Sequence, residues 1–96
     1  MPKHDIILKP DATADLDDLN AYDATCILDA IEDHLTFEPQ KESRSRIKRL
    51  RGIQPADYRL RVDHYRVFCT VEESRVTVLR VLHKDACQRF YREEPS

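Results

Sequence analysis

The sequence has no long apolar run, because charged residues interrupt every hydrophobic stretch well before the roughly 18 residues that a membrane-spanning helix requires. It also lacks a secretory signal, since Met1–Asp5 leads into a short mixed stretch and then into an acidic one. The composition of a transit peptide is missing as well. These absences predict a cytoplasmic protein that makes no contact with a membrane.

Paired cysteines and clustered histidines are absent too. The three cysteines are odd in number, lie far apart and form no Cys-x-x-Cys motif: Cys26, Cys69 and Cys87. A disulfide framework is therefore not expected, and a reducing compartment is the simpler interpretation. The four histidines show no ligand spacing with one another or with the cysteines: His4, His34, His64 and His83. We expect no metal site and no cofactor.

Charge is what the chain has in quantity: 35% of its 96 residues are charged and 41% are hydrophobic. This composition is typical of a globular protein, and the length predicts one domain over residues 1–96. Residues 11–38 hold nine acidic and no basic residues, whereas fourteen basic residues and eight acidic ones follow from Lys41 onward. The basic half favours a polyanion or an acidic partner, although a solvated helical face followed by an ordinary charged sheet would give the same asymmetry.

The first half of the chain predicts one strand and two helices. A β-branched-rich strand covers 4–9, and Pro10 closes it. A short helix follows, on which apolar residues recur at helical spacing: Ala12, Leu16 and Leu19. Asn20 can cap a second helix, with Asp23 as its capping-box partner, and Pro39 marks the end. One face of this second helix forms a stripe without acidic residues, which consists of Cys26, Ile27, Ala30, Ile31, His34 and Leu35.

The second half of the chain predicts a sheet. Residues 40–51 are too basic and too weakly periodic for a core element, and Gly52 and Pro55 indicate turns after them. Apolar residues then recur with a period of two, which predicts three strands in an antiparallel meander: 58–62, 65–71 and 75–81. The tail, 85–91, can form one helical turn. The predicted fold class is α+β, a single small domain in the order β-α-α-β-β-β with the helices packed on one face of an antiparallel sheet.

The alternation around Asp63 and His64 predicts an unusual pair of arginines. If these two residues form a hairpin turn, the flanking strands pair in one register: Val62 with Tyr65, Arg61 with Arg66, Leu60 with Val67, and Arg59 with Phe68. Arg61 then lies opposite Arg66 on the exposed face. Like charges in a cross-strand pair are destabilising by roughly 0.2–1 kcal/mol, so we expect a bound anion to relieve the repulsion. Neutralisation by Asp57, Asp63 or a nearby glutamate is the alternative.

Other side chains near this face are candidates for binding or chemistry. Arginine grips phosphate at two points, and Phe68 beside the arginines could stack on a nucleobase or pack against Leu79. At the end of the last strand, His83 and Lys84 bring a titratable imidazole and an ammonium to one edge of the sheet. Tyr91, in a tail that can fold back over the sheet, is a candidate for base stacking or proton donation.

Four short motifs follow one another along the second half of the chain: Lys48-Arg-Leu-Arg-Gly52, Tyr58-Arg-Leu-Arg61, Tyr65-Arg-Val-Phe68 and Val81-Leu-His-Lys84. Their order and spacing resemble those of the RelE/ParE toxins of bacterial type II toxin–antitoxin systems. The similarity is clearest over residues 47–91. The N-terminal half, with its two predicted helices, agrees with the family in length and order.

The resemblance implies a metal-independent endoribonuclease that enters the ribosomal A site and cuts mRNA, with a 2′-hydroxyl attacking the adjacent phosphate. By position, Arg59 and Arg61 fall where the family often has lysines, and Arg66 falls on its phosphate-gripping arginine. Two further positions match the basic residue after the last strand and the tyrosine near the C-terminus: Lys84 and Tyr91 (Phe90 with one gap).

The residue patterns and the resemblance together give two sets of expected site residues. The catalytic set is Arg59, Arg61, Arg66, His83, Lys84 and Tyr91. The RNA-binding set is Lys48, Arg49, Arg51 and Phe68. Because an arginine side chain hardly deprotonates, the proton acceptor is expected to be His83, Lys84 or the RNA itself.

Two other functions fit the same resemblance. One is a ParE-like toxin that poisons DNA gyrase and performs no chemistry of its own, and the other is a degenerate member that only binds its antitoxin. The arginine pair followed by His83 and Lys84 favours the nuclease, because a gyrase binder needs no phosphate-gripping cluster. All three imply a cognate antitoxin, a small protein with a segment that covers the sheet or the helices.

Overall fold

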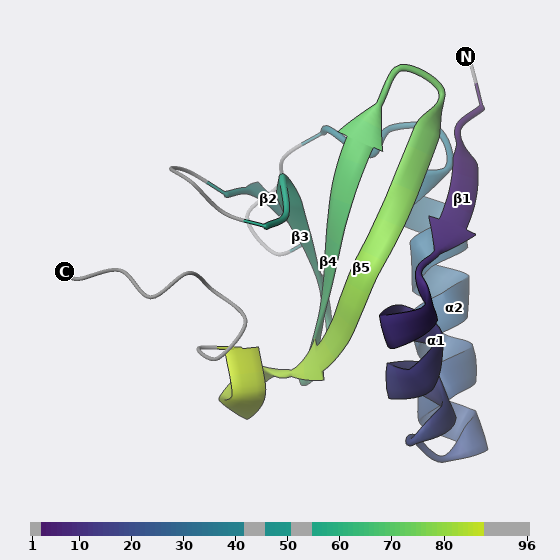
Figure 1. The fold of residues 1–96 in the computed structure, drawn as a ribbon, viewed down its shortest axis with the longest axis vertical. Coiled ribbons are helices and arrows are strands. Elements are labelled where there is room, and N and C mark those ends of the chain that lie inside the picture. Colours follow the sequence, from purple (N-terminus) through teal and green to yellow (C-terminus); the bar gives the residue numbers. More distant parts are fainter. Residues whose placement is uncertain (1–2, 42–45, 51–54, 88–96) are drawn as a thin grey trace, which may run out of the picture.

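A computed structural model describes residues 3–41, 46–50 and 55–87 of the protein. The elements follow one another along the chain (Figure 1): β1 (Asp5–Leu8), α1 (Pro10–Asp17), α2 (Ala21–Leu35), β2 (Ile47–Arg49), β3 (Tyr58–Val62), β4 (Tyr65–Glu72), β5 (Arg75–His83) and the 3-10 helix η1 (Lys84–Ala86). The strands form one sheet in the order β1-β5-β4-β3-β2. The predicted α+β class is confirmed.

Two features of the sheet differ in detail from the sequence-based prediction. Ile47–Arg49 forms a short edge strand, β2, antiparallel to β3, where the sequence predicted no core element. With three residues it is too short for its alternation to stand out, although Ile47 is buried opposite Leu60. The first strand, β1, runs parallel to β5, so the sheet is mixed.

Local signals account for the helices. Pro10 begins α1, where its missing N–H is not needed and its fixed φ suits a helix. The side chain of Asn20 accepts a hydrogen bond from the backbone N–H of Asp23 (2.8 Å), so the predicted cap of α2 is confirmed. The buried stripe of α2 is Ile27, Ile31 and Leu35.

The hairpin of β3 and β4 has the predicted register. Arg61 pairs with Arg66, Leu60 with Val67, and the turn falls at Asp63 and His64. Asp63 has a φ of 53°, in the left-handed region that aspartate tolerates better than most residues. The turn therefore places Leu60 and Val67 on the face toward the helices, and Phe68 on the other face.

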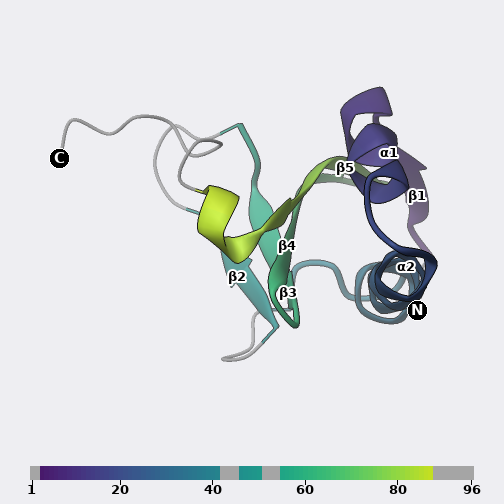
Figure 2. The same ribbon diagram turned by 90° about the horizontal axis from the view of Figure 1, so that it is seen from below.

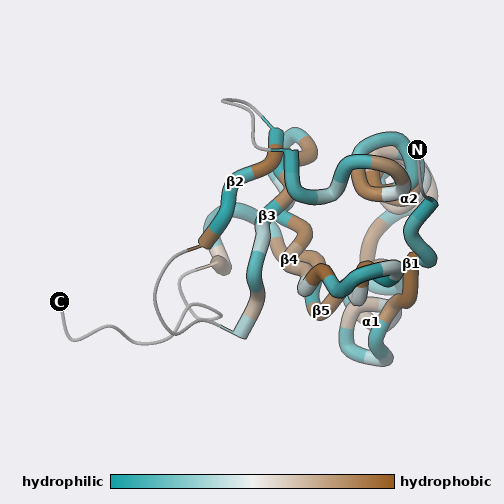
Figure 3. Tube along the Cα trace, turned by 90° about the horizontal axis from the view of Figure 1, so that it is seen from above, coloured by the Kyte–Doolittle hydropathy of each residue, from teal (hydrophilic) through white to brown (hydrophobic). Residues whose placement is uncertain are grey.

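Two clusters of apolar side chains form the core. The main cluster fills the space between the helices and the sheet. In Figure 2 both helices lie at the end of the sheet that holds β1 and β5, away from η1. In Figure 3 the apolar stretches of the chain gather at β4 and β5, in the middle of the molecule. A smaller cluster lies on the other face and is built by Ala56, Phe68 and Cys87. Burial raises the pKa of Cys69, in the main cluster, to about 12, so it stays a protonated thiol.

A carboxylate of α1 completes the edge of β5. Strand β1 pairs with β5 only as far as Val78, and beyond it Asp15 accepts a hydrogen bond from the backbone N–H of Val81 (2.8 Å). The same carboxylate receives Nε and Nη2 of Arg80 at 2.7 and 3.0 Å. This bidentate contact raises the pKa of Arg80 and fastens α1 to the sheet.

No helix among the described residues is long and apolar enough to cross a membrane.

Asp15→Ala removes these contacts and should lower the free energy of unfolding by about 2 kcal/mol, since hydrogen bonds to charged groups contribute more than neutral ones. Urea denaturation followed by circular dichroism measures the change. Asp17→Ala, at an exposed position of the same helix, is the matched control and should leave stability nearly unchanged. Equal losses in the two variants would show that the Asp15 contacts add no stability of their own.

Candidate functional site

A basic cleft lies at the turn end of the β3–β4 hairpin. Its volume is about 420 Å³, and six side chains line it: Arg46, Arg61, Asp63, His64, Arg66 and Lys84. Four of these are cations and one is a carboxylate, so the cleft attracts anions. We refer to these six residues as the basic cleft.

Backbone pairing of three neighbouring segments brings the cations together. Arg61 and Arg66 are a cross-strand pair. The backbone N–H of Arg61 donates to the carbonyl of Arg46 (2.7 Å), which extends the β2–β3 pairing by one residue. The backbone N–H of Lys84 donates to the carbonyl of His64 (2.7 Å) and ties the start of η1 to the hairpin turn.

The guanidinium groups contact the backbone around the turn. Nη1 of Arg66 donates to the carbonyls of Asp63 (3.0 Å) and Tyr65 (2.9 Å). Nη1 of Arg46 donates to the carbonyl of Arg61 (3.4 Å). Within the described ranges, Arg61 itself forms no ion pair. The cleft therefore holds at least one guanidinium that no described carboxylate neutralises, as the anion-binding interpretation requires.

Arg59 and Lys48 lie next to the basic cleft without lining it. They form a cross-strand pair on β3 and β2, two residues along from Arg61 and on the same face. Nε of Arg59 is buried and has no hydrogen-bond partner in the described part of the chain. Three arginines were expected in the site: Arg59, Arg61 and Arg66. Arg61 and Arg66 line the basic cleft, and Arg46 lines it in place of Arg59.

Two of the expected RNA-binding residues, Phe68 and Arg49, lie outside the basic cleft. Phe68 has no exposed surface and packs in a cluster with Ala56, Cys87 and Leu79. The alternative expectation of packing against Leu79 is therefore confirmed, and stacking on a base would require repacking. The guanidinium of Arg49 lies 5.9 Å from the ring centroid of Tyr58, its cross-strand partner, in a cation–π contact. Two more expected site residues lie outside the described residues: Arg51 and Tyr91.

His83 and Lys84 do not share a cavity. Strand β5 contains a bulge at Leu79, because Cys69 pairs with Val78 and Phe68 with Arg80. One extra residue shifts the alternation, so His83 pairs with Tyr65 on the face toward the helices. His83 and Lys84 lie together at the end of β5, as expected, but only Lys84 lines the basic cleft with the arginines.

His83 instead lines a small cavity of about 120 Å³. Nδ1 of His83 accepts a hydrogen bond from the backbone N–H of Asp85 (3.1 Å), and its ring makes a T-shaped contact with the ring of Tyr65, with the centroids 5.6 Å apart. The hydroxyl of Tyr65 donates to Asp23 on α2 (3.2 Å). Burial, and then this hydrogen bond, raise the pKa of Tyr65. The contacts join the end of β5 to the start of α2.

Sequence reasoning missed two residues of the basic cleft, Arg46 and His64. Arg46 lies just before a strand that was not predicted, so its neighbours in the sheet could not be known. His64 was assigned only to the turn, although a turn residue next to a cross-strand arginine pair is well placed to reach the same ligand. Among the described residues, no group of three His, Cys, Asp or Glu side chains could hold a metal ion.

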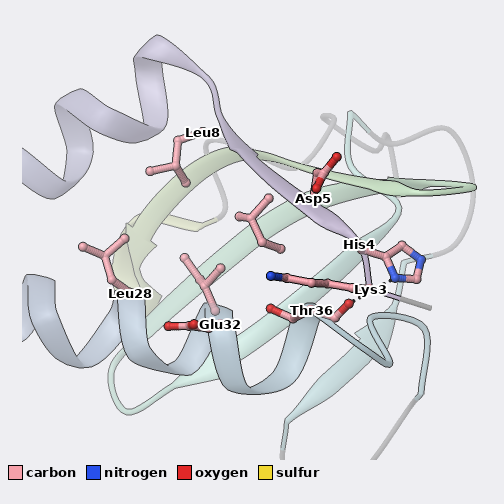
Figure 4. Close-up of a pocket in the computed structure, with 9 residues that line it drawn as sticks. Lys3, His4, Asp5, Leu8, Leu28, Glu32 and Thr36 are labelled. Atoms are coloured by element: carbon pink, nitrogen blue, oxygen red, sulfur yellow. Dashed lines mark hydrogen bonds between the residues drawn. The ribbon is translucent and has the colours of Figure 1, made fainter. Parts of the chain in front are cut away.

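A second groove lies between β1 and α2, on the helix side of the sheet (Figure 4). Its volume is about 430 Å³, and apolar side chains of both elements form much of its wall: Ile6, Leu8, Leu28 and Ile31. Lys3, Glu32 and Thr36 lie at its polar end. Leu28 is 43% exposed, which is a large exposure for a leucine on an otherwise packed helix. We refer to this as the β1–α2 groove.

Comparison with known families assigns the chain. A family profile described as the ParE toxin of type II toxin–antitoxin systems (parDE) matches residues 6–86, which include every element of the fold except the first residue of β1. The chain belongs to the RelE/ParE family of type II toxin–antitoxin toxins. A search of curated proteins found no match to this toxin.

Solved structures share the toxin's fold. A chain of the RelBE2 toxin–antitoxin complex from Mycobacterium tuberculosis superposes with a TM-score of 0.70 at 23% identity, covering 84% of this toxin and 98% of that chain. The archaeal RelE–RelB complex from Pyrococcus horikoshii gives 0.70 at 21% identity, with 88% and 98% covered. The RelB–RelE complex from Methanococcus jannaschii gives 0.64 at 21%, with 88% and 96% covered.

If Arg61 and Arg66 repel each other in the ligand-free toxin, Arg61→Thr should raise the free energy of unfolding by about 0.5 kcal/mol at low salt. The gain should shrink as salt screens the charges. Urea denaturation at several salt concentrations measures it. Arg75→Thr, on an exposed arginine that pairs with Glu72 at 3.2 Å, is the control and should show no gain. A destabilised Arg61 variant would contradict the repulsion.

Proposed function

We propose that this toxin is a ribosome-dependent endoribonuclease that cuts mRNA and thereby inhibits translation. The observation that carries the proposal is the basic cleft, where Arg46, Arg61, Arg66 and Lys84 surround one cavity. Placing like charges opposite each other is unfavourable for folding alone, so a polyanionic ligand supplies the reason for the arrangement. An RNA backbone is such a ligand, and its affinity depends on the cations that contact phosphate.

The proposed reaction uses the RNA's own 2′-hydroxyl. Its oxygen forms a bond to the adjacent phosphorus, and the bond from phosphorus to the 5′-oxygen breaks, which leaves a 2′,3′-cyclic phosphate and a 5′-hydroxyl. Negative charge grows on the phosphoryl oxygens in the transition state. Arg61 and Arg66 lie on opposite strands, so their guanidinium forks can hold two of those oxygens.

Two protons must also move, one from the 2′-hydroxyl and one to the 5′-oxygen. Arginine serves neither step well because it stays protonated. The ammonium of Lys84 is the donor in the basic cleft for the leaving oxygen. Tyr91 remains a predicted second donor, and Arg59 a predicted contact to a neighbouring phosphate.

A second candidate is the gyrase poison without chemistry. The burial of Phe68 favours it, because the basic cleft as described then has no Phe, Tyr or Trp ring on which a base could stack. Primer extension on translated mRNA after induction of the toxin separates the two. Codon-phased cuts support the nuclease, whereas gyrase-linked DNA breaks without such cuts support the poison.

Arg66→Ala should relieve growth inhibition and lower the rate of mRNA cleavage on programmed ribosomes about 100-fold, as expected when one group that stabilises transition-state charge is lost. Single-turnover cleavage of a labelled message measures the rate. Arg75→Ala, an exposed arginine far along β5 from the hairpin turn, is the control and should cleave normally. Undiminished toxicity of the Arg66 variant at normal protein levels would refute the catalytic assignment.

The proposed partner is a cognate antitoxin. The three structures that share the fold are toxin–antitoxin complexes. In this toxin the β1–α2 groove offers apolar surface, and the helices around it carry acids without lysine or arginine. An antitoxin segment with apolar and basic side chains fits that groove. Acidic or apolar side chains of the same partner are expected over Arg59, Arg61 and Arg66.

Leu28→Asp puts a charge into the β1–α2 groove and should weaken antitoxin binding about 30-fold, the size of an interface hot spot. Isothermal titration calorimetry with the cognate antitoxin measures the affinity. Tyr22→Asp, on the same helix but outside the groove and 77% exposed, should bind normally. Equal affinities for the Leu28 variant and the wild type would place the antitoxin elsewhere.

A further inference from the structure

The basic cleft contains two side chains that can accept a proton. Its arginines and Lys84 are donors at neutral pH, which leaves the carboxylate of Asp63 and the imidazole of His64. The proton acceptor was expected to be His83, Lys84 or the RNA itself, but the bulge at Leu79 places His83 on the other face of the sheet. Within the basic cleft, the residues of this chain that can take that role are therefore the two of the hairpin turn.

His64 is held in place at the rim between two cavities. It lines both the basic cleft and the small cavity around His83. Its carbonyl accepts the backbone N–H of Lys84 (2.7 Å), which fixes the turn against η1. Its ring lies 6.0 Å from the ring of His83, centroid to centroid, with a tilt of 33°. His64 is exposed, and it borders both cavities.

The charges around His64 distinguish it from Asp63. Its neighbours on the cleft side are Asp63, Arg61, Arg66 and Lys84, and those in the small cavity are Asp23, Cys26, Tyr65 and His83. An ionised carboxylate repels an approaching phosphate, whereas a neutral imidazole accepts a proton without that repulsion. Imidazole is also the side chain that most often exchanges protons near neutral pH.

We propose that His64 is a catalytic residue of the basic cleft, the base that removes the proton of the attacking 2′-hydroxyl. The inference rests on the proposed endoribonuclease function. As the 2′-oxygen bonds to phosphorus, its proton passes to the free nitrogen of the His64 ring. The electron pair of the breaking bond stays on the 5′-oxygen, which takes a proton from the ammonium of Lys84. The imidazolium then gives its proton to solvent, and the neutral amine of Lys84 takes one from solvent, which restores both side chains.

The test is single-turnover cleavage of mRNA on programmed ribosomes by the full-length toxin over a range of pH. His64→Gln should lower the rate about 100-fold, the usual effect of losing a general base, and should lose the rise of rate with pH that the wild type shows. Binding of a non-cleavable 2′-deoxy message should be unchanged. Free imidazole in the buffer should restore part of the activity of His64→Ala, which a merely structural role would not allow.

Control variants and the wild-type toxin decide whether His64 is the base. His34→Gln, on α2 and outside both cavities, is the matched control and should cleave as the wild type does. Normal cleavage by His64→Gln, or loss of the pH-dependent rise in His83→Gln or Asp63→Asn alone, would overturn the assignment while leaving the nuclease in place. A wild-type toxin that cuts no message under any condition would overturn the nuclease and the role of His64 together.

Discussion

The two-residue turn at Asp63 and His64 decides on which face of the sheet each side chain of β3 and β4 lies. Because side chains alternate along a strand, a shift of one residue would move the whole apolar set to solvent and the arginines into the core. The left-handed backbone of Asp63 holds the observed register. The same register that buries Leu60 and Val67 sets Arg61 against Arg66. Core and candidate site are therefore two results of one constraint.

The molecule separates its charges by face. The helix side is acidic and apolar, with the main core and the β1–α2 groove, while the opposite face carries the basic cleft. The fold draws its stability from the apolar layer beneath the helices, so the arginines do not have to contribute to it. This division lets one surface accept a protein partner while the other is matched to a polyanion.

Sequence patterns gave the parts of the fold that depend on local rules. Period-two alternation and a two-residue turn predicted the pairing of Arg61 with Arg66, and the capping preference of asparagine predicted the start of α2. The errors arose from features that local patterns do not contain. Residues distant in sequence cover Phe68, and a single-residue bulge moves His83 to the other face. Strand β2 is too short for a periodic signal, so Arg46 had no predicted place.

The parallel pairing of β1 with β5 has a consequence for how the protein is made. Among the described strands, the one synthesised first pairs with the one synthesised last, and Asp15 likewise accepts a hydrogen bond from Val81, which is synthesised much later. Domains fold during translation only as their contacts become available. A nascent chain that stops before Arg75 therefore lacks every strand partner of β1 and three residues of the main core: Val76, Val78 and Val81.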